Sequence, residues 1–508
     1  MSEALTQALL QTAGTPRIWL VVLCASLYGT FVGAVPGLTA TMAVALFIPI
    51  AYWLDPIAAL AAVVTMESCA IFAGDIPGTL LRIPGTPASA AYTNEAYRFT
   101  RRGQPSRALG VCLVFSVAGG LFGAFVLMGL GQQLARIATQ FSAVEYFWLY
   151  LLGLSCAVLV SQGSAAKATF ALLLGLVLST IGLSAAHAQA RLTFGRPELF
   201  QGITFVPAMI GLFGFSEVLR NVLVLDQEKG AEPASSKITS ACTGPALRLL
   251  GRRKLAFVRS GAIGALIGML PGAGADIAAW VSFGASRRAA RPAPDTDSDN
   301  HALSGIGDAS TANSAALAGT WIPALVFGIP GDSITAIVIG VLLMKNIRPG
   351  PEIFEKQTAL VYSIYLLFIL ANLVLIPVGL LAIKAGGAMV RVPRRILLPL
   401  ILMFCIVGAY AVNGSYFDVG VMLAMGILGF LVERRDIPPG PIVLGIILGG
   451  PLEERFVQAL SGSQGLLASL FGRPLAAALG ILCLVLWASL AAMRVRRRER
   501  TAVQRPDA

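Results

Sequence analysis

Long apolar stretches constrain the fold of this chain more than any other feature of its sequence. Each is close to the roughly 20 residues that an α-helix needs to cross a bilayer. Such stretches include residues 18–35, 108–130, 168–184, 322–344, 359–383 and 475–493. Hydrophobic residues make up 56% of the sequence and charged residues 13%, whereas soluble domains contain about 45–50% apolar residues. We therefore predict an all-α polytopic membrane protein with about 11–12 transmembrane helices.

The net charge of +12 comes from basic residues that lie between or just after the apolar stretches. They cluster at 98–107, 252–254 and 384–395, and in the tail that begins at Arg494. This placement is typical of cytoplasmic loops that anchor a membrane protein, and it argues against nucleic-acid binding. It predicts a cytoplasmic C-terminus. The N-terminal residues contain no basic region before an apolar core, so we expect no cleaved signal peptide.

The seven cysteines and two histidines show no spacing that is typical of a metal site. The cysteines form no CxxC pair, and His187 and His301 have no cysteine or histidine partner at ligand distance in the sequence. We expect neither a metal site nor a disulfide framework. A membrane-embedded enzyme would need a nucleophile with its base, an HExxH helix or an acidic metal cluster, and the sequence contains none of these.

A pair of Pro-Gly motifs occurs twice, in the same order. The motifs are GTFVGAVPGLTATMA at 29–43 and LLRIPGTPASA at 80–90, and then GALIGMLPGAGADIA at 264–278 and VFGIPGDSITA at 326–336. Pro36 and Pro84 are 48 positions apart, whereas Pro271 and Pro330 are 59 apart. The polar stretch at 286–309 accounts for this insertion in the second copy. The order and spacing indicate an internal duplication.

The duplication and the polar stretches predict four regions. These are a first membrane repeat at 1–225, a cytoplasmic linker at 226–259, a second membrane repeat with its following helices at 260–460, and a C-terminal transmembrane helix with a basic cytoplasmic tail at 461–508. The loop after the first motif contains only Asp55, whereas its counterpart contains Arg287, Arg288 and Arg291. Because basic loops stay in the cytoplasm, equivalent loops are expected on opposite sides, which predicts an inverted-topology repeat.

Each Pro-Gly motif predicts a break in a helix and a new helix start. Irregular backbone at membrane depth persists only where protein or a wet cavity satisfies its polar groups. The new helix start has unpaired N–H groups and a partial positive charge, which attract carboxylates. We predict that the breaks converge on an anion site; the alternative is that they only kink helices or form interfacial turns. The predicted substrate-binding residues at the breaks are Pro36, Gly37, Thr39, Thr41, Pro84, Gly85, Thr86, Ser89, Gly272, Gly331, Ser333 and Thr335.

Charged residues near the breaks are further candidates, because a charge in hydrocarbon costs on the order of 3 kcal/mol or more. Asp75, Asp276 and Asp332 are predicted to couple transport to Na⁺ or H⁺, with Glu67 as the next candidate. For Asp276 and Asp332 the alternative is that the carboxylate only caps its helix. Arg82 is predicted to pair with a substrate carboxylate; the alternative is an interfacial arginine that extends to water.

Five long motifs spread over most of the chain carry a family resemblance. They are GAVPGLTATMAVALFIPIAYWLDPIAAL, IPGTPASAAYTNEAYRFTRRGQPSRALG, GALIGMLPGAGADIAAWVSFG, GTWIPALVFGIPGDSITAIVIGVLLMKNIRPGP and DIPPGPIVLGIILGGPLEERF. With these motifs the sequence resembles the large membrane subunit of the tripartite tricarboxylate transporters, the TctA-like family. Two stretches depart from the family pattern. Residues 72–75 read FAGD where a YGGS-like run is usual, and residues 309–314 read ASTANS in place of PEAANN but retain Asn313, a further predicted substrate-binding residue.

The resemblance implies a secondary transporter of the bacterial inner membrane. Such a carrier imports tricarboxylates, dicarboxylates or related organic anions by symport with a cation, and needs no cofactor other than the coupling Na⁺ or H⁺. The resemblance also implies two partners, a small membrane subunit and a periplasmic solute-binding protein. The alternative is the membrane subunit of an ATP-driven importer, although the polar loops contain no EAA-type signature.

Overall fold

The computed structural model describes residues 2–161, 164–184, 189–224, 242–289, 298–390, 394–461 and 470–503. Regular structure in these residues is helical, apart from a ribbon in which β1 (Gly182–Leu183) pairs antiparallel with β2 (Ala190–Arg191). Seven helical segments of this described part are long and apolar enough to cross a membrane, and five further apolar helices have 10–17 residues. This agrees with the predicted all-α polytopic class, and the total of 11–12 crossings stays a prediction.

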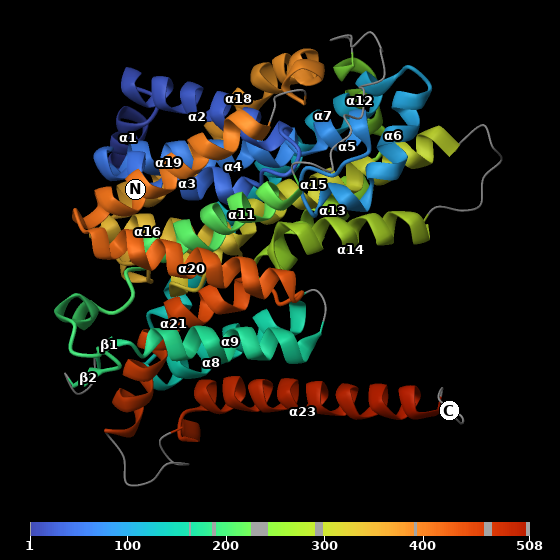
Figure 1. Ribbon diagram of the computed structural model, residues 1–508. Coiled ribbons are helices and arrows are strands. Elements are labelled where there is room, and N and C mark those ends of the chain that lie inside the picture. The colour runs from blue at the N-terminus through green and yellow to red at the C-terminus, as the bar shows by residue number, and fades with distance from the viewer. Residues whose placement is uncertain are drawn as a thin grey trace. The chain divides into compact units, whose positions relative to one another are not determined.

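The chain divides into two compact units, whose elements are labelled in Figure 1. Unit 1 comprises Met1–Ala138 and Thr204–Arg435, and unit 2 comprises Thr139–Ile203 and Asp436–Ala508. The first part of unit 1 contains α1 (Ser2–Gln11), α2 (Pro16–Ala34), α3 (Ala40–Trp53), α4 (Pro56–Ala73), α5 (Asp75–Leu81), η1 (Ser89–Ala91), α6 (Thr93–Arg101) and α7 (Pro105–Ala138). Its second part contains α10 (Phe205–Met209), the π-helix η3 (Ile210–Phe215), α11 (Ser216–Val224), α12 (Thr243–Arg252), α13 (Lys254–Gly268), α14 (Gly274–Ala289), α15 (Ser298–Phe327), α16 (Ser333–Met344), α17 (Glu352–Lys356), α18 (Thr358–Met389), α19 (Arg394–Asn413) and α20 (Tyr416–Arg434).

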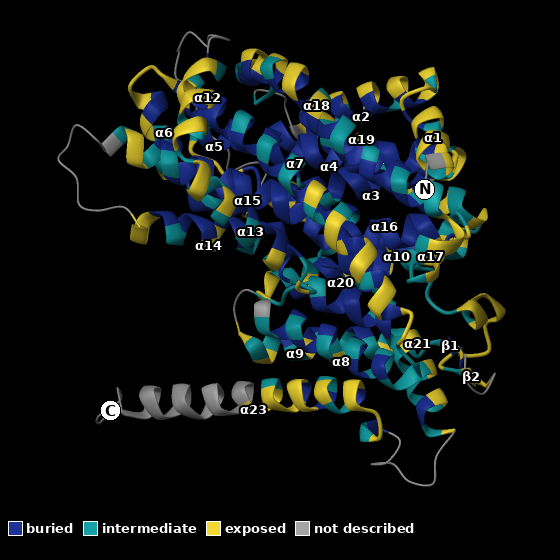
Figure 2. Ribbon diagram, turned by 180° about the vertical axis from the view of Figure 1, so that it is seen from behind, coloured by how far each residue is buried: buried dark blue, intermediate teal, exposed yellow. Residues whose placement is uncertain are grey.

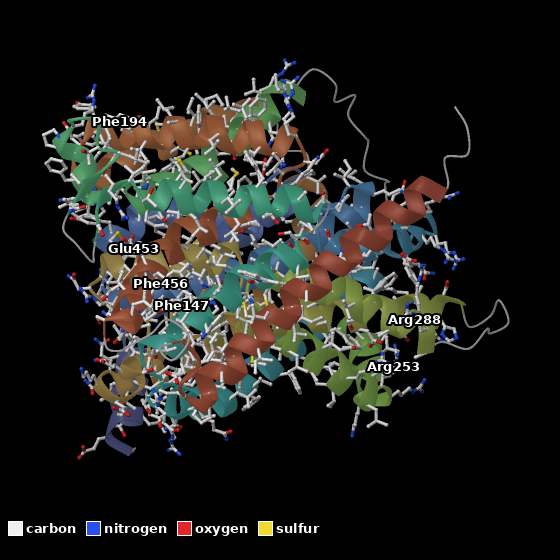
Figure 3. All side chains as sticks on the ribbon, turned by 90° about the horizontal axis from the view of Figure 1, so that it is seen from below. Phe147, Phe194, Arg253, Arg288, Glu453 and Phe456 are labelled. Carbon is white, nitrogen blue, oxygen red and sulfur yellow. The ribbon has the colours of Figure 1, made fainter. Side chains whose placement is uncertain are left out.

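Unit 2 is a smaller group of helices. Besides the ribbon, it contains α8 (Ala143–Val160), α9 (Ala165–Ser179), η2 (Pro197–Gln201), α21 (Gly440–Leu460) and α23 (Pro474–Val503). The rings of Phe147 and Phe456, labelled in Figure 3, lie 5.2 Å apart between α8 and α21. The guanidinium group of Arg191 donates to both carboxylate oxygens of Glu453, at 3.0 and 2.8 Å, and so attaches the ribbon to α21.

Two long helices form the core of unit 1. Residues 58–73 of α4 and residues 305–326 of α15 are buried throughout (Figure 2). Such continuous burial fits helices that are surrounded by other helices, and in α15 it includes polar side chains such as Asp308 and Asn313. The break that follows α15 is buried at residues 329–331, whereas the break after α4 and α5 is buried at Gly85 and Thr86 and exposed at residues 82–84.

The helices before the first break of each copy pack on α4 and α15 in the same way. A Cβ atom at Gly29 or Gly33 of α2 would lie 2.5 or 2.4 Å from a backbone oxygen of α4. A Cβ atom at Gly264 or Gly268 of α13 would lie 2.3 or 2.4 Å from a backbone oxygen of α15. Only glycine permits this approach of two backbones. The paired glycines occupy equivalent positions in the two sequence motifs.

A break occurs at each of the four Pro-Gly motifs. Helix α3 begins at Ala40, α14 at Gly274 and α16 at Ser333, whereas the turn η1 precedes α6 after Pro84. The backbone at Gly37 and Gly272 has φ values of 87° and 79°, which β-carbon sterics make rare for other residues. The motifs thus end their helices for the predicted local reason.

The two copies also pack against each other. The ammonium group of Lys345, just after α16, donates to the carbonyl oxygen of Tyr52 in α3 at 2.6 Å. Arg287 of α14 forms an ion pair with Glu95 of α6. The α3–α16 contact and the α6–α14 contact lie at opposite ends of unit 1 in both views (Figures 1 and 2). The first broken helix of each copy thus contacts the second broken helix of the other.

The four predicted regions differ from the two compact units, which group residues by contact and not by repeat. Residues 226–241 of the predicted linker and residues 290–297 of the polar insertion lie outside the described residues. The rest of the linker is helical, in α12 and the start of α13. The division by repeat therefore stays a prediction from sequence.

Candidate functional site

A cavity of about 310 Å³ with a mixed polar and apolar lining lies where the breaks of the two copies meet in unit 1. Its lining comprises Thr39, Ala40, Thr41, Ile71, Thr86, Pro87, Phe213, Glu217, Arg220, Gly274, Ala275, Asp276, Asn313, Asp332, Ser333, Ile334 and Glu433. Both copies contribute hydroxyl groups, and the second copy also contributes the carboxylates of Asp276 and Asp332. Its size and mixed lining suit a small polar ligand.

The second break of each copy ends in a reciprocal cap. In the first copy the backbone N–H of Thr86 donates to the Ser89 hydroxyl, and the N–H of Ser89 donates to the Thr86 hydroxyl, both at 3.1 Å. In the second copy the N–H of Asp332 donates to the Thr335 hydroxyl at 2.9 Å, and the N–H of Thr335 donates to the Asp332 carboxylate at 2.8 Å. Each cap satisfies two donors that would otherwise lack partners. Thr86 and Asp332 are therefore held rigidly at the cavity wall.

Asp332 and Asp276, the two predicted coupling aspartates of the cavity, accept hydrogen bonds from different parts of the chain. Asp332 caps its own helix, as described above, and one carboxylate oxygen also accepts from the Thr335 hydroxyl at 2.7 Å. Asp276 accepts a hydrogen bond from the backbone N–H of Ala88, in the first copy, at 3.0 Å. Neither aspartate forms an ion pair with another described residue. Asp276 thus links the two copies across the cavity, whereas Asp332 acts on its own break.

Three charged residues of the lining come from outside the Pro-Gly motifs. Glu217 and Arg220 of α11 form an ion pair, and Nη1 of Arg220 lies 3.6 Å from Oε2 of Glu433 in α20. The amide of Asn221 donates to Glu217 at 2.7 Å and to the carbonyl oxygen of Gly37 at 3.3 Å, so α11 contacts the first break. Sequence reasoning missed these residues. For Glu217 and Arg220 the available signal was the occurrence of charges inside the apolar segment Phe205–Leu223, and for Glu433 it was a charge near the end of the apolar segment Tyr416–Arg434.

Asn313 lines the cavity and has a buried side-chain oxygen without a hydrogen-bond partner among the described residues. Its side chain is only 3% exposed, and Oδ1 accepts no hydrogen bond from the described residues. A buried acceptor without a partner costs on the order of 1–3 kcal/mol. A donor or cation that reached this oxygen would recover this cost.

Comparison with known proteins assigns the chain to a protein family. The model of the tripartite tricarboxylate transporter TctA family matches residues 19–444. The chain belongs to the TctA family. It is therefore the multi-pass membrane permease of a tripartite transporter, a system with other subunits, and not an enzyme.

Two relatives of this TctA chain come from Agrobacterium vitis. An uncharacterised 52.8 kDa protein in the TAR-I ttuC' 3' region is 32% identical over 498 residues, which cover 96% of both chains. An uncharacterised protein in the TAR-II ttuC' 3' region is 33% identical over 238 residues, which cover 46% of this chain and 97% of the relative. No solved structure matches the chain.

The structure brings only some of the predicted site residues of this TctA chain to the cavity. Those in its lining are Thr39, Thr41, Thr86, Asp276, Asn313, Asp332 and Ser333. Those outside the lining shape or support the breaks, and they are Pro36, Gly37, Pro84, Gly85, Ser89, Gly272, Gly331 and Thr335. Gly272 and Gly331 connect the two breaks of the second copy, because the N–H of Gly272 donates to the oxygen of Gly331 at 2.8 Å.

Arg82 and Asp75 also lie outside the cavity lining. Arg82 ends α5 in the left-handed conformation, with φ 62°, and its exposed side chain donates from Nε to Asn94 at 2.9 Å. Asp75 is buried and accepts a hydrogen bond from the Tyr92 hydroxyl at 2.6 Å. Their roles in binding and coupling stay predictions, without support from their position.

Glu67 is fully buried on α4 next to the cavity wall. The indole N–H of Trp321 donates to one carboxylate oxygen at 3.5 Å, and the other oxygen has no hydrogen-bond partner among the described residues. The described residues contain no group of three or more histidine, cysteine, aspartate or glutamate side chains that could hold a metal ion.

Proposed function

We propose that this TctA permease binds an organic carboxylate in the cavity between its broken helices and imports it with Na⁺ or H⁺. The observation that carries this proposal is the convergence of both copies on one cavity that combines hydroxyls, helix starts and the guanidinium group of Arg220. Hydroxyls and N–H groups at helix starts suit carboxylate oxygens. An arginine adds a charge-assisted hydrogen bond.

The charge of the lining explains why such a carrier would need a cation. Besides Arg220, the lining contains the carboxylates of Glu217, Asp276, Asp332 and Glu433. Two like charges 4 Å apart repel by about 4 kcal/mol at an effective dielectric constant of about 20. An anionic substrate is therefore disfavoured until Na⁺ or protons neutralise these acids. Binding of the anion and of the cation are thus coupled.

An inverted repeat would place the cavity near the middle of the bilayer. The equivalent glycine contacts of α2 and α13 and the crossed contacts of α3 with α16 and α6 with α14 support this arrangement. The arginine clusters around 98–107, 252–254 and 287–288 favour a cytoplasmic position for the end where α6 meets α14. In a bacterial inner membrane, the opposite end would receive substrate from a periplasmic binding protein, with the small membrane subunit as the second partner.

Transport in proteoliposomes tests the proposal. Vesicles with both membrane subunits and the binding protein would be given labelled citrate or succinate under an imposed Na⁺ or H⁺ gradient, without ATP. We expect accumulation that depends on one of the gradients. Uptake that needs ATP would instead indicate an ATP-driven importer.

The coupling step can be tested with Asp332→Asn and Asp276→Asn. Asparagine caps helices about as well as aspartate, so the break at Asp332 should persist. We expect both variants to lose gradient-driven accumulation and to retain most substrate exchange. The matched control is Asp55→Asn, because Asp55 caps α4 by accepting from the N–H of Ala58 at 3.1 Å but lies outside the cavity lining. Normal accumulation in both cavity variants would leave these carboxylates as helix caps only.

A further inference from the structure

A second cavity, of about 380 Å³, lies at the arginine-rich end of unit 1. It is lined by residues of α6, of the α12–α13 junction, of the end of α14 and of the start of α15. None of the predicted site residues belongs to its lining. The function proposed above therefore does not depend on this cavity.

The charge of this second cavity is opposite to that of the central one. Its charged lining consists of Arg98, Arg253 and Arg287, with Glu95 as the acidic member. Arg287 pairs with Glu95 and lies over the ring of Phe283, 4.9 Å from its centroid. Arginine side chains in such numbers suit an anion with several carboxylate groups.

The guanidinium group of Arg253 has a nitrogen without a hydrogen-bond acceptor among the described residues. One of its terminal nitrogens, Nη2, lies 3.2 Å from the buried carboxylate of Asp308, which also contacts Arg259 at 3.0 Å. The other, Nη1, is buried and donates to no described residue. A buried, charged donor without an acceptor is costly. An anion would supply the missing acceptor only after the Arg253 side chain turns this nitrogen toward the cavity.

The same two segments line both cavities. Residues 86–98 and helix α14 contribute Thr86 and Asp276 to the central cavity, and Arg98 and Arg287 to the second one. Along α14, Asp276 and Arg287 are separated by roughly 16 Å at a rise of about 1.5 Å per residue. The two cavities thus lie one after the other along residues 86–98 and α14.

Residues 86–98 and α14 contact each other directly between the two cavities. The indole N–H of Trp280 donates to the carbonyl oxygen of Pro87 at 3.0 Å, and the rings of Tyr92 and Phe283 lie 6.5 Å apart. The ion pair of Arg287 with Glu95 follows at the arginine-rich end. These contacts hold the two segments together between the cavities.

We propose that the arginine-lined cavity is a second binding site for the transported di- or tricarboxylate, at the end where the anion is released. This inference rests on the proposed function for the identity of the anion. The basic residues of this end favour its position on the cytoplasmic side. Anion leaving the acidic central cavity would then meet a cavity of favourable charge once the contacts between α14 and residues 86–98 open.

Protection of an engineered cysteine tests the proposal without measuring transport. Ala302 lines the cavity, so Ala302→Cys would be introduced into the full chain after replacement of the exposed Cys24. Inverted membrane vesicles would be treated with a membrane-impermeant maleimide, with and without citrate. We expect citrate to slow the labelling at least several-fold, whereas chloride at the same ionic strength should not.

Three substitutions show which charges hold the anion. Arg98→Gln and Arg287→Gln should each raise the citrate concentration for half-protection about tenfold, because each removes a charge-assisted hydrogen bond. Glu95→Gln should lower it, since it removes the acidic group of the lining and frees Arg287. Arg287→Gln and Glu95→Gln break the same ion pair, so a purely structural role for that pair predicts equal effects of one sign. Arg288→Gln is the matched control, because exposed Arg288 neighbours Arg287 on α14 but lies outside the lining.

Several results would overturn the inference. They are an absence of protection by citrate, equal protection by inorganic phosphate, an equal loss of protection in Arg288→Gln, and a weaker citrate effect in Glu95→Gln. Failure of the proposed function would be seen separately, as an absence of gradient-driven accumulation in proteoliposomes. Because labelling reports occupancy alone, the two failures are distinguishable.

Discussion

Arg220 is the cationic side chain in the lining of the central cavity, and it lies in an apolar helical segment where a charge is costly. The neighbouring Glu217 and Glu433 keep it paired in this structure. A substrate carboxylate would compete with these glutamates for the guanidinium group. Arg82, the arginine that the sequence favoured for this role, instead donates to Asn94 outside the lining.

The two arginines can be compared directly with Arg220→Gln and Arg82→Gln. Loss of a charge-assisted hydrogen bond of about 1.5–3 kcal/mol should raise the substrate concentration for half-maximal uptake by one to two orders of magnitude in Arg220→Gln. We expect a much smaller change in Arg82→Gln. Initial rates over a range of substrate concentrations would measure both. A larger effect in Arg82→Gln would support the original assignment to Arg82.

At the scale of elements, close glycine contacts decide how the broken helices pack. Helices α2 and α13 approach α4 and α15 through glycines at equivalent positions of the two copies, and the breaks follow directly. A side chain at these positions would push the helix away from its partner. It would thereby displace the break that lines the cavity.

Gly268→Ala tests this packing. Its Cβ would lie 2.4 Å from the backbone oxygen of Ala316, and overpacking of this kind costs about 1–3 kcal/mol. We expect a lower melting temperature of the detergent-solubilised protein, together with weaker substrate binding. Gly129→Ala in α7 is the control, since a Cβ at Gly129 would meet nothing within 4 Å. Equal stability of the two variants would argue against a close helix contact at Gly268.

At the scale of the whole molecule, the topology of the proposed repeat can be measured. Trp53, at the end of α3, is 76% exposed, and Arg288 is exposed near the end of α14. Cysteines introduced at these two positions should react with an impermeant reagent from opposite faces of the membrane, with position 288 on the cytoplasmic face. Labelling of intact cells and of inverted vesicles would show this. Labelling of both positions from one face would contradict the inverted repeat.

The sequence by itself determined the features that depend on local chemistry. Apolar stretches of membrane-spanning length identify a polytopic helical protein. Proline lacks a backbone donor and glycine adopts positive φ, so the breaks at Pro36-Gly37 and Pro271-Gly272 follow from the residues themselves. The hydroxyl and acidic residues after the breaks were predicted for the same reason, and Thr41, Thr86, Asp276 and Asp332 do line one cavity.

Only the tertiary structure decided which side chains share that cavity. Asp276 bonds to the backbone of Ala88 across 188 positions, and Arg220 reaches the site from a helix without a Pro-Gly motif. Arg82 adjoins a break in sequence, but its left-handed backbone ends α5 and its side chain bonds to Asn94 outside the lining. The physical reason is that a break is set by the conformational limits of a few consecutive residues, whereas the content of a cavity depends on the packing of helices that are distant in the chain.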